Sequence, residues 1–321
     1  MTEVLRLKII VTGGAGFIGS HLAKNLIQEG HEVYIIDCLH PYYSIERKRK
    51  HLTNIESHGA FHYSDLNLLN QDETMAEFIR IRPDAIVHLA ALPGVAYSIE
   101  KPLEYVDFDI KATINVLEAA GKAGASKIVF ASSSSVYGNQ EGPFTEEMAV
   151  GKVISPYAAS KFSAESFCHV YEDLYGFQMN ILRFFTVYGP WGRPDMAIGK
   201  FIKQLIRGEE ITVFGEGRAR DFTYIEDIIH GIYLTLTVQT NSDILNIGSG
   251  RPITMDTLLQ ELKQHFPGMK INKETSRAGD VLKTWADISK AKRQLGYEPK
   301  VDFKKGLDET VKWAKENEVF L

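Results

Sequence analysis

Short apolar runs rich in β-branched residues alternate with longer amphipathic stretches along most of the chain. Runs of this length and composition are typical of buried strands. They predict strands at 7–12, 33–36, 61–64, 85–89, 127–131, 179–184, 211–214 and 243–247. Apolar residues at helical spacing predict a first helix that ends near Gly30 and further helices at 103–121, 157–175, 198–206, 223–237, 255–266, 289–295 and 304–315. Strands that alternate with helices indicate an α/β fold with a parallel, doubly wound Rossmann sheet.

The chain shows no repeat and no low-complexity linker that would separate two domains in sequence. Glycine and proline predict a loop over 185–197, and a basic stretch predicts a second loop over 218–222. We therefore expect a smaller C-terminal α/β substrate-binding domain that is assembled from separate segments. The expected division is 1–185 plus 223–250 for a nucleotide-binding domain, and 186–222 plus 251–321 for the substrate domain.

Composition excludes several classes of protein. The 321 residues are 44% apolar and 24% charged, which is ordinary for a globular protein, and the net charge of −5 provides no basic field for nucleic acid or an anionic membrane. No apolar run reaches the roughly 18 residues that a membrane span needs. Two cysteines are too few for a disulfide framework, and no Cys/His cluster has zinc spacing, so a cytoplasmic protein without a metal is expected.

A glycine-rich turn follows the first predicted strand directly. Gly13, Gly16 and Gly19 lie between that strand and the first helix, where backbone amides can approach a pyrophosphate. Asp37 ends the second strand, 18 residues after Gly19. A carboxylate there accepts hydrogen bonds from a ribose 2′-hydroxyl and repels a 2′-phosphate, which favours NAD over NADP. An ordinary loop acid is the alternative interpretation of Asp37.

A possible acid/base group lies in the segment 155–161. Ser155 and Pro156 predict a helix start, which places Tyr157 and Lys161 four residues apart on one helix face. A free tyrosine has a pKa of about 10, and an ammonium one turn away stabilises the phenolate. The pair is therefore a candidate acid/base, although a Tyr packed under a solvated Lys has the same spacing. Ser133, just after the fifth strand, is the candidate hydroxyl partner.

Taken together, these motifs resemble the extended short-chain dehydrogenase/reductase superfamily. The resemblance rests on the glycine turn, Asp37, the pair Asp65-Leu66, the segment 88–91, the serines before Gly138 and the Tyr157/Lys161 pair. Two later segments, 183–190 and 193–197, are similar to the UDP-glucuronate 4-epimerases within that superfamily. The segments 220–225, 277–280 and 285–287 match its nucleotide-sugar members more generally.

The resemblance implies roles for individual residues. Tyr157 would be the catalytic base, Lys161 would bind the nicotinamide ribose, and Ser133 would hold the sugar 4-hydroxyl. The implied NAD-binding residues are Gly13, Gly16, Phe17, Ile18, Gly19, Asp37, Asp65, Leu66, Leu89, Ala90, Ala91, Tyr157 and Lys161. The implied substrate-binding residues are Ser133, Ser134, Ser135, Tyr157, Thr186, Arg193, Lys200, Val213, Arg220, Arg277 and Asp280. Thr186 and Arg193 would face the sugar carboxylate, and Arg220 and Arg277 the UDP diphosphate.

The implied reaction is inversion at C4 of UDP-glucuronate to UDP-galacturonate through a 4-keto sugar. Three alternatives remain open at this point. An epimerase of neutral UDP-hexoses is disfavoured by Arg193, and a UDP-glucuronate decarboxylase by Ser135, where that reaction usually uses a glutamate. A non-catalytic NAD-binding protein is disfavoured because Tyr157 and Lys161 are both present. A homodimer through the helices near 104–121 and 157–175 is expected, although a face buried within the monomer would have the same pattern.

Overall fold

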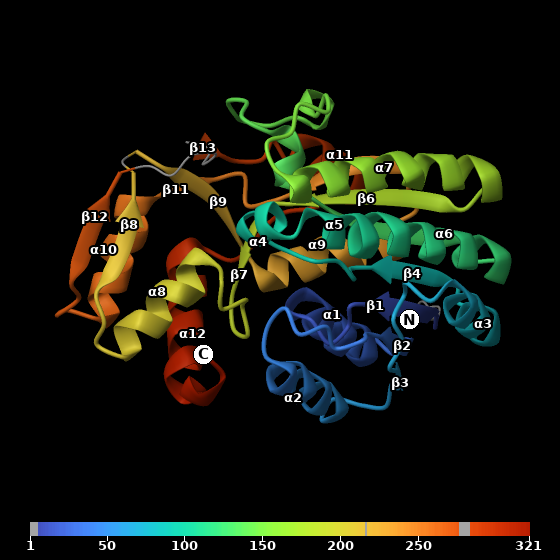
Figure 1. Ribbon diagram of the computed structural model, residues 1–321, viewed down its shortest axis with the longest axis horizontal. Helices are drawn as coiled ribbons and strands as arrows, with labels where there is room; N and C mark the ends of the chain where they lie inside the picture. The colour runs from blue at the N-terminus through green and yellow to red at the C-terminus, as the bar shows by residue number, and fades with distance from the viewer. Residues whose placement is uncertain (1–5, 216, 276–282) are drawn as a thin grey trace.

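Seven parallel strands form the central sheet of the computed structural model, which describes residues 6–215, 217–275 and 283–321 (Figure 1). Their order in the sheet is β10-β6-β5-β4-β1-β2-β3, and every neighbouring pair is parallel. The strands are β1 (Lys8–Thr12), β2 (Glu32–Ile36), β3 (His62–Ser64), β4 (Ala85–His88), β5 (Lys127–Ser133), β6 (Gln178–Phe184) and β10 (Asp243–Ile247). The order reverses between β1 and β4, which confirms the predicted doubly wound sheet.

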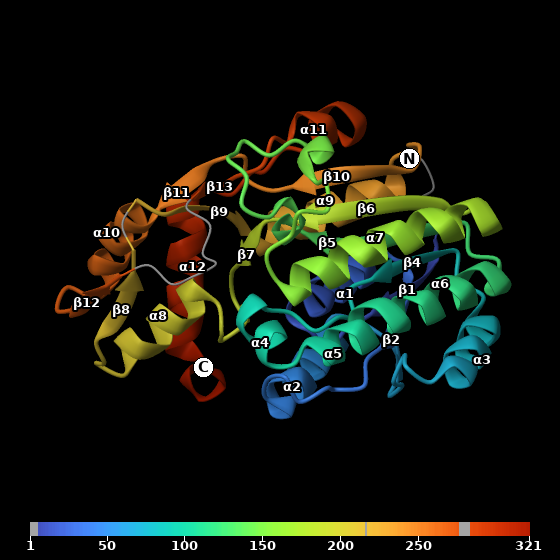
Figure 2. The same cartoon turned by 45° about the horizontal axis from the view of Figure 1, so that its top comes forward.

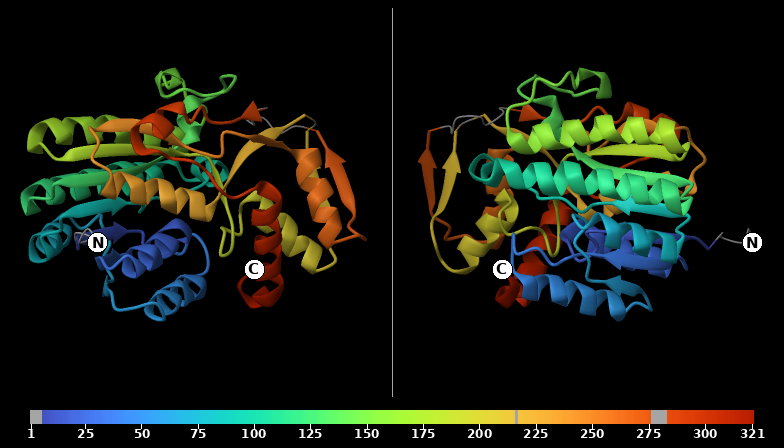
Figure 3. Two further views of the ribbon diagram at one scale, coloured as in Figure 1. Left: turned by 180° about the vertical axis from the view of Figure 1, so that it is seen from behind. Right: turned by 45° about the vertical axis from the view of Figure 1, so that its right-hand side comes forward.

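Side chains of the central strands alternate between two apolar layers. In β1, Ile9 and Val11 belong to one core and Ile10 to the other, as the period of two requires. The first core packs under α1 (Phe17–Gln28) and α9 (Ile225–Thr237), which lie side by side behind the sheet (Figure 3, left). The second core packs under α3 (Gln71–Ile81), α6 (Ala112–Ala123) and α7 (Pro156–Tyr175), which cover the opposite face (Figure 2). A further helix, α2 (Ile45–Glu56), packs against α1.

Helix α7 begins and ends as its sequence predicts. The Ser155 hydroxyl accepts a hydrogen bond from the backbone N–H of Ala158 at 3.1 Å, and Pro156 is the first helical residue. Gly176 has φ of +71° and ends the helix in the left-handed conformation. This start fixes the position of Tyr157 in the first turn.

The predicted helix over 103–121 is divided in the structure. The short helices α4 (Val95–Glu100) and α5 (Pro102–Tyr105) precede a π-helical turn, η1 (Val106–Lys111), which continues into α6. The wider turn brings Asp109 into the interior, where its carboxylate accepts hydrogen bonds from the Leu92 N–H at 2.8 Å and the Ser160 hydroxyl at 2.7 Å. Apolar periodicity detects the helix, but it cannot detect one extra residue in a turn. Helix α3 was not predicted.

Smaller sheets lie beside the central one, at its carboxyl edge (Figure 1). One contains β7 (Thr186–Tyr188), β9 (Ala219–Tyr224), β11 (Pro252–Thr254) and β13 (Lys283–Thr284), and the other pairs β8 (Ile211–Phe214) with β12 (Ile271–Glu274). The remaining helices are α8 (Ala197–Ile206), α10 (Met255–His265), α11 (Ser289–Leu295) and α12 (Phe303–Glu316), with short 3₁₀ turns η2 (Ser134–Tyr137), η3 (Glu146–Met148) and η4 (Glu318–Phe320).

The predicted loop over 218–222 was wrong, because most of it forms strand β9, and α9 begins at Ile225 rather than 223. The charged residues of this segment conceal a strand. Asp221 is fully buried, and its carboxylate accepts hydrogen bonds from Thr223, from Ser249, from the Gly250 N–H and from the Ala286 N–H. Buried charges are tolerated when their hydrogen bonds are satisfied in this way. Strand β7 likewise lies inside the loop predicted for 185–197.

Candidate active site

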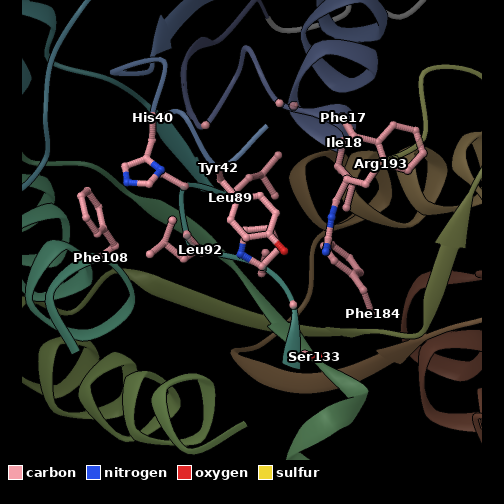
Figure 4. Close-up of a pocket in the computed structure, with 18 of the residues that line it drawn as sticks. Phe17, Ile18, His40, Tyr42, Leu89, Leu92, Phe108, Ser133, Phe184 and Arg193 are labelled. Atoms are coloured by element: carbon pink, nitrogen blue, oxygen red, sulfur yellow. The ribbon is translucent and has the colours of Figure 1, made fainter. Parts of the chain in front are cut away.

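One large cavity opens at the carboxyl ends of the central strands. Its volume is about 370 Å³, and it is lined by the turns after β1, β2, β4, β5 and β6 together with the start of α7. Figure 4 shows His40 and Phe108 at one end of it and Arg193, Phe184 and Phe17 at the other, with Ser133 projecting from the end of β5. Ligands of doubly wound sheets bind at this edge, where the strand order reverses.

The glycine turn leaves no room for side chains. Gly13 has φ of +69°, and a Cβ there would lie 2.8 Å from the Ala90 nitrogen. A Cβ on Gly19 would lie 2.3 Å from the Gly13 carbonyl oxygen. Both residues line the cavity, as do Gly16, Phe17 and Ile18 at the N-terminus of α1. The backbone therefore forms a cradle at a positive helix end that suits a pyrophosphate.

Asp37 lies next to this cradle at the end of β2. Its carboxylate accepts hydrogen bonds from the Ala15 N–H at 3.1 Å and from the Leu39 N–H at 2.8 Å, one on each oxygen. Each carboxylate oxygen accepts about two hydrogen bonds, so acceptor capacity remains for ligand hydroxyls. Asp37 lines the cavity together with Leu66, Leu89, Ala90 and Ala91. These residues fit the adenosine half of NAD.

Tyr157, Lys161 and Ser133 converge on the same cavity. Lys161 is buried, and its ammonium donates a hydrogen bond to the Ala131 carbonyl at 3.1 Å. The Ser133 hydroxyl accepts from the Ser135 N–H and donates to the Ser135 hydroxyl, each at 3.2 Å. The Tyr157 ring meets the edge of the Tyr105 ring at a centroid distance of 6.0 Å. A phenol, an ammonium and a hydroxyl thus face one space, which is the arrangement that proton transfer from a bound alcohol requires.

A buried histidine lies in the sheet beneath these groups. His88 is held between the hydroxyls of Thr12, at 2.7 Å from Nδ1, and Thr113, at 3.0 Å from Nε2. Burial lowers the pKa of His88 to about 3, and the charge of Lys161 contributes in the same direction. The histidine is therefore a neutral structural element near neutral pH.

Arg193 projects from the loop between β7 and α8 into the same cavity. It forms an ion pair with Asp195, with Nε 3.0 Å from Oδ1. Arg47 of α2 is bonded to this loop, because its guanidinium donates a hydrogen bond to the Gly192 carbonyl. The same guanidinium donates to the Phe320 carbonyl and lies against the rings of Trp191 and Trp313. The loop thus holds a cation at the end of the cavity where Phe17 and Ile18 also lie (Figure 4).

Most of the predicted site residues line this one cavity, including Ser134, Ser135 and Thr186. Four described residues do not: Asp65 and Lys200 are exposed, Val213 is in the apolar core, and Arg220 is half-buried in β9. Arg277 and Asp280 lie outside the described residues. The roles of all these residues stay predictions.

Sequence reasoning missed several lining residues, among them His40, Tyr42, Gly94 and Phe108. A signal was present for Tyr42, because the segment after β2 lies at the carboxyl end of a central strand, where ligands bind. Phe108 was concealed by the π-helical turn. In the part of the chain that the structure describes, no group of three or more metal-ligating side chains was found, and no described helix is long and apolar enough to cross a membrane.

Known proteins resemble the chain over nearly its whole length. The model of the NAD dependent epimerase/dehydratase family matches residues 9–248. A UDP-glucuronate 4-epimerase of Thermodesulfobacterium geofontis is 40% identical over 96% of each chain. The UDP-glucuronic acid 4-epimerase of Bacillus cereus, solved with UDP-glucuronic acid and NAD, is 36% identical with a TM-score of 0.90, covering 96% of this chain and 99% of that one. A UDP-glucose 4-epimerase of Thermotoga maritima is 31% identical with a TM-score of 0.88, covering 97% and 99%.

Proposed function

The chain belongs to the NAD-dependent epimerase/dehydratase family, and we propose that it inverts C4 of UDP-glucuronate to give UDP-galacturonate. The observation that carries this choice of substrate is the position of Arg193. Its guanidinium shares one cavity with Tyr157, Lys161 and Ser133, so a sugar whose C4 hydroxyl is at Tyr157 can present a carboxylate to the arginine. Guanidinium and carboxylate form strong two-point pairs, for which a neutral hexose offers no partner.

Each of the three residues has a defined part in the reaction. Tyr157 removes the proton of the C4 hydroxyl, Ser133 holds that hydroxyl, and Lys161, one helical turn after Tyr157, would bind the nicotinamide ribose. Gly13, Gly16 and Gly19 would hold NAD, which would supply a reversible acceptor for the C4 hydride. A 4-keto sugar turns over in the cavity between the two transfers and is reduced on its other face. Tyr157 then returns its proton to the C4 oxygen, so the net redox change is zero.

The carboxylate of the sugar creates a hazard that Arg193 opposes. The 4-keto sugar is a β-keto acid, which loses CO₂ when the bond from C5 to the carboxylate aligns with the carbonyl π-system. A guanidinium that grips both carboxylate oxygens holds this bond out of alignment. Ser135 contributes no carboxylate to assist the loss of CO₂. The same arginine therefore selects the substrate and protects its intermediate.

The nucleotide anchors the sugar while the sugar turns. We assign this anchoring to residues 186–222 and 251–321, with Arg220 and Arg277 on the diphosphate and Val213, Lys200 and Asp280 nearby. The small sheets of this region lie beside the carboxyl edge of the central sheet (Figure 1). Binding energy from a part of the substrate that does not react can position the part that does.

Two further assignments belong to this proposal. We propose a homodimer through α4, α5, η1 and α7, because this surface exposes Ile99, Leu103, Val106, Val170 and Leu174. Apolar patches of this kind are typical of interaction sites, and light scattering of the purified protein measures the mass of the assembly. We also propose a cytoplasmic location, which the two unpaired cysteines support.

An NMR time course tests the proposed activity. Purified protein is incubated without added NAD with UDP-glucuronate, UDP-glucose or UDP-N-acetylglucosamine in separate reactions. We expect UDP-galacturonate to appear and both neutral sugars to persist. The Tyr157→Phe variant is expected to turn over roughly 10³-fold more slowly with unchanged affinity for UDP-glucuronate, because it lacks only the acid/base hydroxyl. Inversion of a neutral sugar alone contradicts the choice of substrate, and release of CO₂ with a UDP-pentose identifies a decarboxylase.

A further inference from the structure

The guanidinium of Arg193 has two edges that can bind a carboxylate, and one of them is already used. Nε donates to Oδ1 of Asp195 at 3.0 Å, and Nη2 donates to Oδ2 of the same side chain. The pair is side-on, with both carboxylate oxygens on the Nε–Nη2 edge. Within the described residues, no group accepts a hydrogen bond from Nη1 of Arg193. The end-on edge formed by Nη1 and Nη2 is thus left for a ligand.

Asp195 is in turn held by a residue from a distant part of the chain. The Tyr42 hydroxyl, in the segment between β2 and α2, donates to Oδ2 of Asp195 at 3.2 Å. The guanidinium carbon of Arg193 lies 5.8 Å from the centre of the Tyr42 ring. Burial and the Asp195 charge raise the pKa of Tyr42 to about 12, so its hydroxyl remains a donor throughout the neutral range.

Gly94 closes this cluster from the turn after β4. A Cβ at this position would lie 2.5 Å from the Tyr42 hydroxyl, 3.4 Å from Nη2 of Arg193 and 3.6 Å from Oδ2 of Asp195. Three segments that are far apart in sequence therefore meet within a few ångströms. Arg193 and Tyr42 also line the main cavity. The arginine is consequently restricted on its side-on edge and accessible on its end-on edge.

We propose that Tyr42 and Asp195 are positioning residues that present the end-on edge of Arg193 to the substrate carboxylate. This inference rests on the proposed function, because it needs an anionic sugar. The ion pair between Arg193 and Asp195 lowers the affinity for the substrate somewhat, because the carboxylates of Asp195 and of the substrate repel each other. It gains a fixed orientation of the guanidinium, and geometry within a few tenths of an ångström determines whether a bound group is productive.

The opposite interpretation is that Asp195 is a placeholder for the substrate carboxylate and must leave before the sugar binds. The two interpretations predict opposite changes in the affinity for UDP-glucuronate when Asp195 is replaced. A positioning residue strengthens the binding of UDP-glucuronate, so its loss weakens binding. A placeholder competes with the substrate, so its loss strengthens binding. In both cases UDP itself, which lacks the sugar, is insensitive to the change.

Calorimetric titration of Asp195→Asn and Tyr42→Phe with UDP-glucuronate and with UDP separates these outcomes. We expect about tenfold weaker binding of UDP-glucuronate to Asp195→Asn, about threefold weaker binding to Tyr42→Phe, and unchanged binding of UDP to both. Tyr233→Phe is the matched control, because Tyr233 also donates to a carboxylate, that of Glu29, but on the exposed surface. Tighter or unchanged binding of UDP-glucuronate to Asp195→Asn overturns the proposal, and so does an equal loss for UDP.

Loss of the substrate carboxylate as CO₂ gives a second readout. General damage to the site would slow the reaction without raising the amount of CO₂ released per epimerisation event. With UDP-glucuronate labelled with ¹³C at the carboxylate, the wild-type protein is expected to release almost no labelled bicarbonate. In Asp195→Asn, CO₂ leaves the 4-keto sugar, the electron pair on C5 takes a proton from water, and the retained hydride accumulates as NADH in equal amount. We expect at least fivefold more bicarbonate per epimerisation event. A ratio equal to that of the wild type contradicts the proposal, whereas a wild-type protein that leaves UDP-glucuronate unchanged refutes the proposed function itself.

Discussion

The two ends of the cavity are built in different ways. At the cofactor end, the glycine turn and Asp37 come from one continuous segment that joins β1, α1 and β2, and backbone atoms form most of the surface. At the sugar end, Tyr42, Gly94 and Arg193 come from three separate loops. The side chains of Tyr42 and Arg193 both bond Asp195, and the backbone of Gly94 lies against them. The first end is held by the regular sheet, whereas the second depends on side-chain hydrogen bonds and packing between separate segments.

This difference indicates how the two ends can change independently. A backbone cradle accepts any ligand with the same phosphates and tolerates almost no substitution at its glycines. A cluster of loop side chains can exchange one charged group for another while the sheet stays intact, which is how one fold serves several substrates. Specificity for an anionic sugar is then a property of a few side chains around Arg193.

The largest expected effect comes from breaking the cofactor end alone. In Gly19→Val, the new side chain begins 2.3 Å from the Gly13 carbonyl, so the turn must open and the cradle is lost. We expect the purified variant to carry no NAD and its activity to fall by more than roughly 10³-fold, because the residues that remain cannot take up a hydride. Absorbance of the denatured protein measures the retained NAD.

Binding of UDP to this variant should stay close to that of the wild type if the two ends are independent. Gly268→Ala is the matched control, because a Cβ there meets no atom within 4 Å. Loss of UDP affinity in Gly19→Val together with loss of NAD would show that the sugar end depends on the cradle, and the comparison would no longer hold.

The next largest effect comes from breaking the sugar end alone. Arg193→Met keeps much of the side-chain volume and removes the guanidinium, so the substrate carboxylate loses its partner. Truncating one member of such a pair costs about 2–5 kcal/mol, and we expect roughly 100-fold weaker binding of UDP-glucuronate. Retained NAD and affinity for UDP should not change. Equal losses for UDP and UDP-glucuronate would mean that Arg193 contacts the nucleotide instead of the sugar.

The smallest expected effect concerns the sheet beneath both ends. Burial lowers the pKa of His88 from its ordinary 6.5 to about 3, so the unfolded chain binds one more proton than the native protein between these values. The stability that the neutral ring provides is complete above about pH 6.5 and is lost as the pH falls toward 3. From pH 7.5 to 5.5 this loss is about 1.4 kcal/mol.

The variant His88→Gln keeps an amide that can bond both threonine hydroxyls and cannot become charged. We expect urea unfolding to show a decrease in stability between pH 7.5 and 5.5 that is about 1.4 kcal/mol smaller than in the wild type. His21 and His51, whose pKa values burial lowers to about 4 and about 3, account for decreases that remain. If the stability of the variant depends on pH in the same way as that of the wild type, the titration of His88 does not contribute to the loss of stability in acid.

The cofactor end could be predicted from the sequence because its signals are local. A strand, three glycines and an acidic residue lie within about thirty positions, and the fold brings them together without help from the rest of the chain. Tyr157 and Lys161 were predictable for the same reason, since one helical turn separates them. The alternation of strands and helices also predicted the parallel, doubly wound sheet, although not the order of its strands.

The sugar end was predicted only in part because its contacts are long-range. Arg193 was identified from a resemblance, but nothing in the sequence around Tyr42 indicates that its hydroxyl reaches Asp195. Strand β9 was assigned to a loop because the stretch 218–222 is basic. Only the structure shows that Asp221 within it is buried and that five hydrogen bonds satisfy its carboxylate. Polarity of a residue does not reveal whether partners compensate for its burial.

The π-helical turn η1 contains one residue more than a turn of α-helix, and the chain continues beyond it as the regular helix α6. Because each residue of an α-helix advances by about 100°, deleting one residue between 106 and 111 would rotate everything before the turn relative to α6. Phe108 would leave the cavity, and Leu103 would leave the outer surface at the same time. A change of one residue in this turn therefore alters both the lining of the ligand cavity and the exposed apolar face of α5 that we propose as part of a dimer interface. An evolutionary change at either surface must preserve the length of this turn.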